Sequence, residues 1–182
     1  MIYRRHALTG LTGLAAVSAL VAASSGPARA QSSTVPGSGK TPGGSAYKTQ
    51  TLIVGTLSKE QSQLALGRAT HPQVKQFAQF EVAEQTTVAQ VLTDEANPHP
   101  APLDATLKAT LTTLQQSRGK AFDAAYVQAQ IEGHQKLLAI QQAFLNGRPD
   151  DMDHKHIAML ARTVIQMHLT MLGDLQQAVG AA

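Results

Sequence analysis

The chain has 182 residues, with 15 Lys and Arg against 12 Asp and Glu, and it contains no cysteine. Disulfides, thiol catalysis and thiolate metal sites are therefore excluded. Three of the basic residues, Arg4, Arg5 and Arg29, lie within the first thirty positions, so the rest of the chain carries 12 basic and 12 acidic side chains. A chain that is neutral beyond its first segment, and that has no basic cluster, argues against nucleic-acid binding.

Residues 1–30 have the pattern of an export leader. Arg4 and Arg5 precede an apolar run of small residues from 7 to 23, and Ala28-Arg29-Ala30 has the small-x-small pattern of a cleavage site. We therefore expect a signal peptide cleaved after Ala30 and a periplasmic mature protein. The run is too short for a convincing membrane span, so the mature chain is expected to have none. The arginine pair leaves both export routes open, with the general route favoured over the twin-arginine route.

The next segment, residues 31–46, is rich in Gly, Pro and Ser and poor in apolar side chains. Such a composition buries too little surface to offset the entropy of ordering, so we expect a flexible tether. Residues 47–180 have helical periodicity and are expected to form one helical domain.

Four long helices and one short helix are expected in this domain. Pro72 is a favourable first-turn residue, the prolines of residues 97–102 break a helix, and Asn146-Gly147 is a stop signal. The expected helices span about 47–70, 72–96, a short helix from about 103 to 119, 121–145, and 152 or 153 to 178. The fold class is therefore all-α, and the long insertion between the second and third long helices predicts a ferritin-like four-helix bundle with an extra short helix in that crossover.

Polar side chains interrupt the apolar faces of these helices. Glu81 and Glu84 fall within the apolar arc of the second helix, and His134 and His168 lie near the centres of the arcs of the last two long helices. Glu60 lies beside apolar residues of the first helix, and Asp123, Gln130 and Gln141 accompany His134. Because buried carboxylates are costly unless they are paired or bound to metal, this pattern predicts a polar centre in the bundle.

Two interpretations of this centre stay open. In one, Glu60, Glu84, His134 and His168 surround a divalent transition metal, for which Zn²⁺ or Cu²⁺ would suit imidazole and carboxylate ligands. In the other, the same groups form a buried hydrogen-bond network without metal, or the carboxylates reach solvent at the edges of their arcs. Both interpretations predict that His134 faces the bundle centre within reach of His168 or Glu84.

Other candidate residues have simpler explanations. His154 and His156 stand among Asp residues at an expected helix start, where a solvated terminus is the favoured interpretation. The sequence contains no Gly-x-Ser-x-Gly, no His-Glu-x-x-His and no phosphate-binding loop, so no hydrolase mechanism and no catalytic residue are assigned.

The stretch FDAAYVQAQIEGHQ, residues 122–135, resembles an exported bacterial ferritin-like family of unknown function whose members are labelled predicted outer membrane proteins. The family has a Phe-Asp, a Tyr and a Gly-His at this spacing, and the resemblance covers about residues 51–175. Supporting matches are Glu60 with Leu64-Ala65, residues 74–78, and His168-Leu169. The resemblance implies a fold and a compartment, with outer-membrane association as one version, and no reaction.

Two departures weaken a di-iron site. Members of the family commonly carry a histidine where this chain has Gln85, and Ile165 stands where a Glu-x-x-His motif ending at His168 needs a carboxylate. A full di-iron carboxylate centre, and the oxygen chemistry that depends on one, are therefore not expected.

The sequence thus predicts an exported helical-bundle protein without an assigned activity, acting as a periplasmic binding or stress-related module. The alternative is a metal-binding ferritin-like protein with a degenerate site. A metal ion, a second copy of the chain and another envelope component all remain candidate partners.

N-terminal sequencing of exported protein tests the leader. We expect the mature chain to begin at Gln31 and to be recovered in the soluble periplasmic fraction, because the cleavage pattern ends at Ala30. An intact leader recovered with membranes would contradict this prediction.

Overall fold

The computed structural model describes residues 42–181. The predicted signal peptide, its cleavage after Ala30 and the tether up to residue 41 lie outside the described residues.

The described chain is helical, and no strand occurs within residues 42–181. The helices are α1 (Pro42–Arg68), α2 (Pro72–Thr93), α3 (Ala105–Gln116), α4 (Gly119–Asn146) and α5 (Met152–Ala181). The all-α prediction is confirmed, with four long helices and a short one between the second and the third. None of these helices combines the length and the apolar character that crossing a membrane requires.

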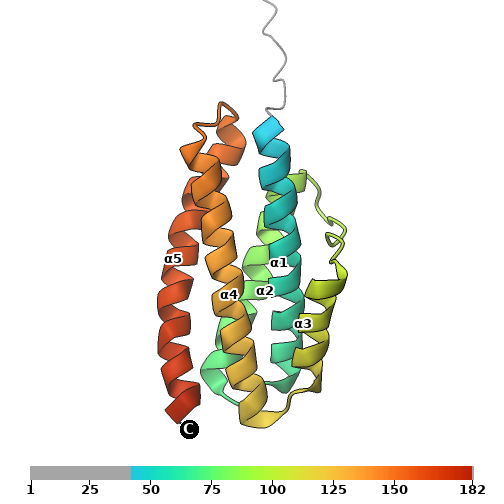
Figure 1. Ribbon diagram of the computed structural model, residues 1–182, viewed down its shortest axis with the longest axis vertical. Helices are drawn as coiled ribbons and strands as arrows, with labels where there is room; N and C mark the ends of the chain where they lie inside the picture. Colours follow the sequence, from blue (N-terminus) through green and yellow to red (C-terminus); the bar gives the residue numbers. More distant parts are fainter. Residues whose placement is uncertain (1–41, 182) are drawn as a thin grey trace, which may run out of the picture. The chain divides into compact units, whose positions relative to one another are not determined.

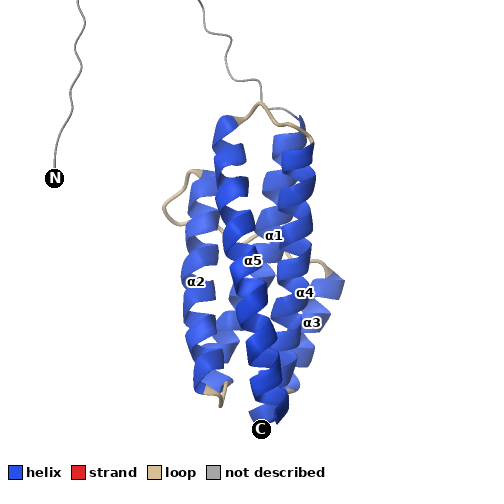
Figure 2. Cartoon of the chain, turned by 90° about the vertical axis from the view of Figure 1, so that its left-hand side faces the viewer, coloured by secondary structure: helices blue, strands red, loops and turns tan. Residues whose placement is uncertain are grey.

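The long helices pack side by side (Figure 1). Helix α1 contacts both α2 and α4, α4 packs along α5, and the short α3 lies against α1 and α4. Helices α2 and α5 run beside each other in Figure 2 but approach closely at few positions. The interior between the four long helices therefore has one loosely closed side, between α2 and α5.

The first helix begins earlier than the sequence predicted. Residues 42–46, which we expected to be tether, form the first turn of α1. Pro42 is compatible with a first turn, and Tyr47 stacks on Phe144 with ring centroids 4.1 Å apart. Helix α1 thus begins one turn before Tyr47, within a segment that composition alone marks as a tether.

Other helix ends differ by a few residues. Helix α2 ends at Thr93 rather than near residue 96, because Asp94 adopts a left-handed conformation with φ of 58°. Helix α5 continues to Ala181 instead of ending near residue 178.

The interior consists of two apolar clusters with polar side chains between them. The larger cluster lies toward the ends of α1 and α5 and includes Phe77, Phe122, Tyr126 and Leu172, and the smaller one is built around Tyr47. Buried polar residues occupy the intervening turns: Thr51, Ser58, Gln61, Glu81, Gln85, Gln130, His134, Gln141 and His168. The predicted polar centre is therefore present and is distributed over all four long helices.

We had expected Asp123 to lie beside His134, and this prediction is wrong. Its carboxylate accepts hydrogen bonds from the backbone N–H groups of Thr70 and His71, at 3.0 and 2.9 Å, and from the Thr70 hydroxyl. This buried group on α4 therefore holds the turn that joins α1 to α2. Gln141 likewise lies away from the histidines, where it accepts a hydrogen bond from the Tyr47 hydroxyl at 2.8 Å.

Asp123→Ala should lower the free energy of unfolding by about 1–3 kcal/mol, because donors in the α1–α2 turn lose their partner. Urea unfolding measures the loss. Asp174→Ala, an exposed position on α5, is the matched control and should change stability by less than about 0.5 kcal/mol. Equal effects of the two substitutions would contradict the role assigned to Asp123.

Candidate metal centre

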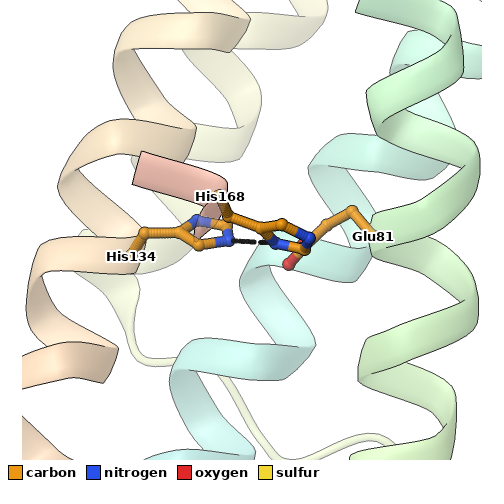
Figure 3. A group of neighbouring side chains, drawn as sticks. All are labelled: Glu81, His134 and His168. Atoms are coloured by element: carbon orange, nitrogen blue, oxygen red, sulfur yellow. Dashed lines mark hydrogen bonds and ion pairs between the residues drawn. The ribbon is translucent and has the colours of Figure 1, made fainter. Parts of the chain in front are cut away.

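Four buried polar side chains meet in the interior, one from each long helix. Glu81 comes from α2, His134 from α4, His168 from α5 and Ser58 from α1. Glu81 and His134 are fully buried, and His168 is only 4% exposed. Figure 3 shows the two imidazoles and the carboxylate converging from three helices.

Three atoms of this group surround one point. Glu81 Oε2 lies 3.3 Å from His134 Nε2 and 3.4 Å from His168 Nδ1, and the two ring nitrogens are 3.2 Å apart. Ligands about 2.0–2.1 Å from a tetrahedral zinc ion would be separated by about 3.3–3.4 Å. The three separations therefore match the spacing of donors on one metal ion.

One orientation of the His134 ring follows from its backbone contact. His134 Nδ1 lies 2.8 Å from the carbonyl oxygen of Gln130, one turn earlier on α4, so Nδ1–H donates to that carbonyl. Nε2 then carries the lone pair of the neutral ring and faces Glu81 and His168. Such a contact is the usual way in which a protein fixes the tautomer of a histidine ligand.

The second oxygen of Glu81 is held by the Ser58 hydroxyl. Ser58 Oγ lies 2.6 Å from Glu81 Oε1 and 2.7 Å from Gln130 Oε1, so its single proton is shared between two acceptors. The amide nitrogen of Gln130 donates to Gln61 at 3.1 Å. These contacts position the carboxylate from the α1 and α4 sides.

Glu81 Oε2 is different, because it has no hydrogen-bond partner among the described residues. Both imidazoles lie within ion-pair distance of it, but neither is aligned for a hydrogen bond. A fully buried carboxylate oxygen in this state is unusual, since buried polar atoms are normally paired. This orphaned atom points at the same place as the two ring nitrogens.

The pKa values of the group are displaced in opposite directions. Burial by itself would raise the pKa of Glu81, but the interactions with His134, His168 and Ser58 outweigh it and lower the pKa well below its usual value. Burial likewise acts to lower the pKa of His134, but Glu81 and the Gln130 carbonyl raise it above 6.5. Without metal, the centre therefore holds a Glu81 carboxylate beside a readily protonated His134.

Glu84 stands at the edge of the centre. Its Oε2 lies 3.4 Å from His168 Nδ1, and its side chain is 21% exposed. Burial and the negative charge of Glu81 raise the pKa of Glu84. Glu84 is not part of the compact group formed by Glu81, His134 and His168, whose donor atoms all lie within 4.8 Å of one another.

Of the four predicted metal ligands, the structure brings His134 and His168 together, places Glu84 beside His168 at the edge of the group, and places Glu60 outside it. The prediction that His134 faces the interior within reach of His168 is confirmed. Glu60 is instead half-buried beside a cavity between α1 and α2, because α1 turns Ser58 toward the centre. The carboxylate that lies between the two histidines is that of Glu81, which the sequence analysis did not include among the ligands. Its position on the apolar arc of α2 could have identified it.

His154 lies at the start of α5, as the sequence indicated, but its side chain is only 19% exposed and contacts the rings of Tyr47 and Phe144. Its backbone N–H donates to Asp151 at 3.1 Å, and its Nδ1 lies 2.6 Å from the other oxygen of that carboxylate. The pair marks the start of α5. Ile165, three positions before His168 on α5, is buried and offers no ligand atom.

The fold and the centre define an all-helical protein with a buried carboxylate–imidazole group. A family model described as a domain of unknown function (DUF4142) matches residues 46–175, so the chain belongs to this family. Comparison with curated proteins and with solved structures gives no match.

The shifted pKa values of His134, Glu84 and Glu81 predict how the stability of the metal-free protein depends on pH. The raised pKa of His134 gives stability that is complete below about pH 6.5 and is lost as pH rises through the folded-state value. The raised pKa of Glu84 acts in the same direction, from about pH 4.5 upward. The lowered pKa of Glu81 gives stability that is present above about pH 4.5 and is lost in acid.

Thermal unfolding in the presence of a chelator should therefore show stability that falls as pH rises above about 6.5. His134→Gln should flatten this alkaline decline, whereas His156→Gln, at an exposed position on α5, should preserve it. The same decline in both variants would show that another group controls it.

Proposed function

We propose that this protein is a metal-binding helical module that holds one divalent transition-metal ion through Glu81, His134 and His168. The orphaned Glu81 Oε2, aimed at the same point as two imidazole nitrogens, is the observation that carries the proposal. An oxygen and two nitrogens suit Zn²⁺ or Cu²⁺, and suit Mg²⁺ poorly because it favours octahedral oxygen coordination.

The residues around the centre fit this role. The Gln130 carbonyl fixes the His134 tautomer, and Ser58 fixes the orientation of the Glu81 carboxylate. The ring of Phe77 lies 5.9 Å from that of His134 and 5.2 Å from that of His168, and it forms an apolar wall. Three protein ligands leave one position for water or for Glu84 from the partly exposed edge.

Protons compete with the metal ion for the ligand atoms of this centre. Metal binding requires neutral His134, whose pKa is raised in the metal-free protein, so binding must release a proton there. Affinity should therefore increase as pH rises.

The broader setting is also proposed. The order of the helices, with α3 inside the long connection from α2 to α4, supports a ferritin-like bundle with one crossover. The leader pattern of residues 1–30 supports export to the periplasm, and the family resemblance leaves association with the outer membrane as one version of that location.

A second function, a binding or stress-related module without metal, is favoured by the charge balance of the centre. Glu81 and protonated His134 compensate each other, so the group can remain buried as an ion pair within a polar network. This alternative requires that metals leave stability unchanged.

Thermal unfolding of chelator-treated protein with added ions separates the two functions. Zn²⁺ or Cu²⁺ at about one hundred times Kd should stabilise the fold by about 2.7 kcal/mol, or about 5–10 °C in Tm, and Mg²⁺ should not. His134→Gln and His168→Gln should abolish the rise, and His156→Gln should retain it. Equal shifts in all three variants would place the metal elsewhere, and no shift in the unmodified chain would favour the metal-free module.

A further inference from the structure

A cavity of about 250 Å³ lies between α1, α2 and the connection that follows α2. In Figure 1 this connection leaves the end of α2 and passes beside α1 before α3 begins. The backbone N–H of Ala101 donates to the Thr56 hydroxyl at 3.1 Å, which fastens the connection to α1. The cavity shares no lining residue with the group formed by Glu81, His134 and His168.

The side chain of Gln85 lines this cavity and has no hydrogen-bond partner among the described residues. Gln85 is only 5% exposed and lines the cavity, yet no group in the described part of the chain is hydrogen bonded to its amide. Gly55 makes room for it, because a Cβ at position 55 would overlap Gln85 Oε1. Buried amides normally have hydrogen-bond partners, so the Gln85 amide is available to a polar ligand in the cavity.

The wall of the cavity carries one charge of each sign. Lys59 and Glu60 are consecutive on α1, are half-buried and both line the cavity. Neither forms an ion pair with another residue between positions 42 and 181. A ligand that satisfies both must therefore carry a negative and a positive group while being neutral overall.

The size of the cavity limits such a ligand. At about 250 Å³, the cavity has room for a small molecule only. This is smaller than the pockets that bind drug-sized ligands. A free α-amino acid combines the required charges with this size.

We infer that this cavity binds a free α-amino acid, with its carboxylate at Lys59, its ammonium at Glu60 and the Gln85 amide hydrogen bonded to it. Charge-assisted hydrogen bonds at both ends would give the selectivity, since a molecule with a single charge leaves one wall residue unsatisfied. The rest of the wall is largely apolar and includes Leu52, Val88, Pro98, Pro100 and Ala101. These residues limit the size of the side chain that the bound amino acid can have.

Calorimetric titration of the full chain tests this inference, with EDTA present so that chelation of metal by amino acids does not contribute. The probes are glycine, L-alanine and L-glutamine, and acetate and methylammonium are the single-charge controls. At least one amino acid should bind saturably, and neither control ion should bind.

Variants locate the binding. Lys59→Gln and Glu60→Gln should each weaken binding by about tenfold or more, and the matched charge removals Lys75→Gln on α2 and Glu132→Gln on α4 should not. Absence of binding by all three amino acids would overturn the inference. Binding that survives both Lys59→Gln and Glu60→Gln would overturn it as well. Because EDTA is present throughout, these outcomes are independent of metal binding at Glu81, His134 and His168.

Discussion

The burial of one carboxylate, that of Glu81, is the constraint on which the interior of the protein depends. Glu81 is fully buried, and such a charge is costly unless opposite charge and hydrogen bonds compensate it. The compensation comes from three other helices: Ser58 on α1, His134 on α4 and His168 on α5. The contacts with the Glu81 carboxylate thereby fix the rotation of each long helix about its own axis. The two apolar clusters lie on either side of this carboxylate.

Much of this arrangement could be predicted from the sequence. Helix positions follow from apolar periodicity and from Pro72, the prolines of 97–102 and Asn146-Gly147, and the inward direction of His134 and His168 follows from strongly apolar arcs. The assignment of Glu60 failed for a physical reason. Helix α1 has small and polar residues on every side, so its sequence does not determine its rotation, and only tertiary packing directs Ser58 inward.

Long-range pairing limited the prediction in two other places. Asp123 bonds to a turn more than fifty positions earlier in the chain, and nothing in the residues around it indicates that partner. The first turn of α1 lies directly before Tyr47, which stacks on the distant Phe144, although composition favoured a tether there. Glu81 was visible on its arc, but sequence alone could not decide between it and Glu84, which lie on neighbouring rows of α2.

In the proposed function, the negative charge of Glu81 is balanced either by a proton or by a metal ion. Without metal, the proton on His134 balances Glu81, and with metal, the ion replaces that proton. Glu84 at the partly exposed edge and the sparse packing between α2 and α5 place the approach to the centre on that side. Because the charge of Glu81 is compensated in either state, the fold does not require the ion.

Anomalous diffraction from crystals grown with Zn²⁺, from protein purified without an affinity tag, tests the central claim most directly. The predicted result is a peak about 2.0–2.2 Å from Glu81 Oε2, His134 Nε2 and His168 Nδ1. A peak found only near other groups, such as His154 and His156 on α5, would contradict it.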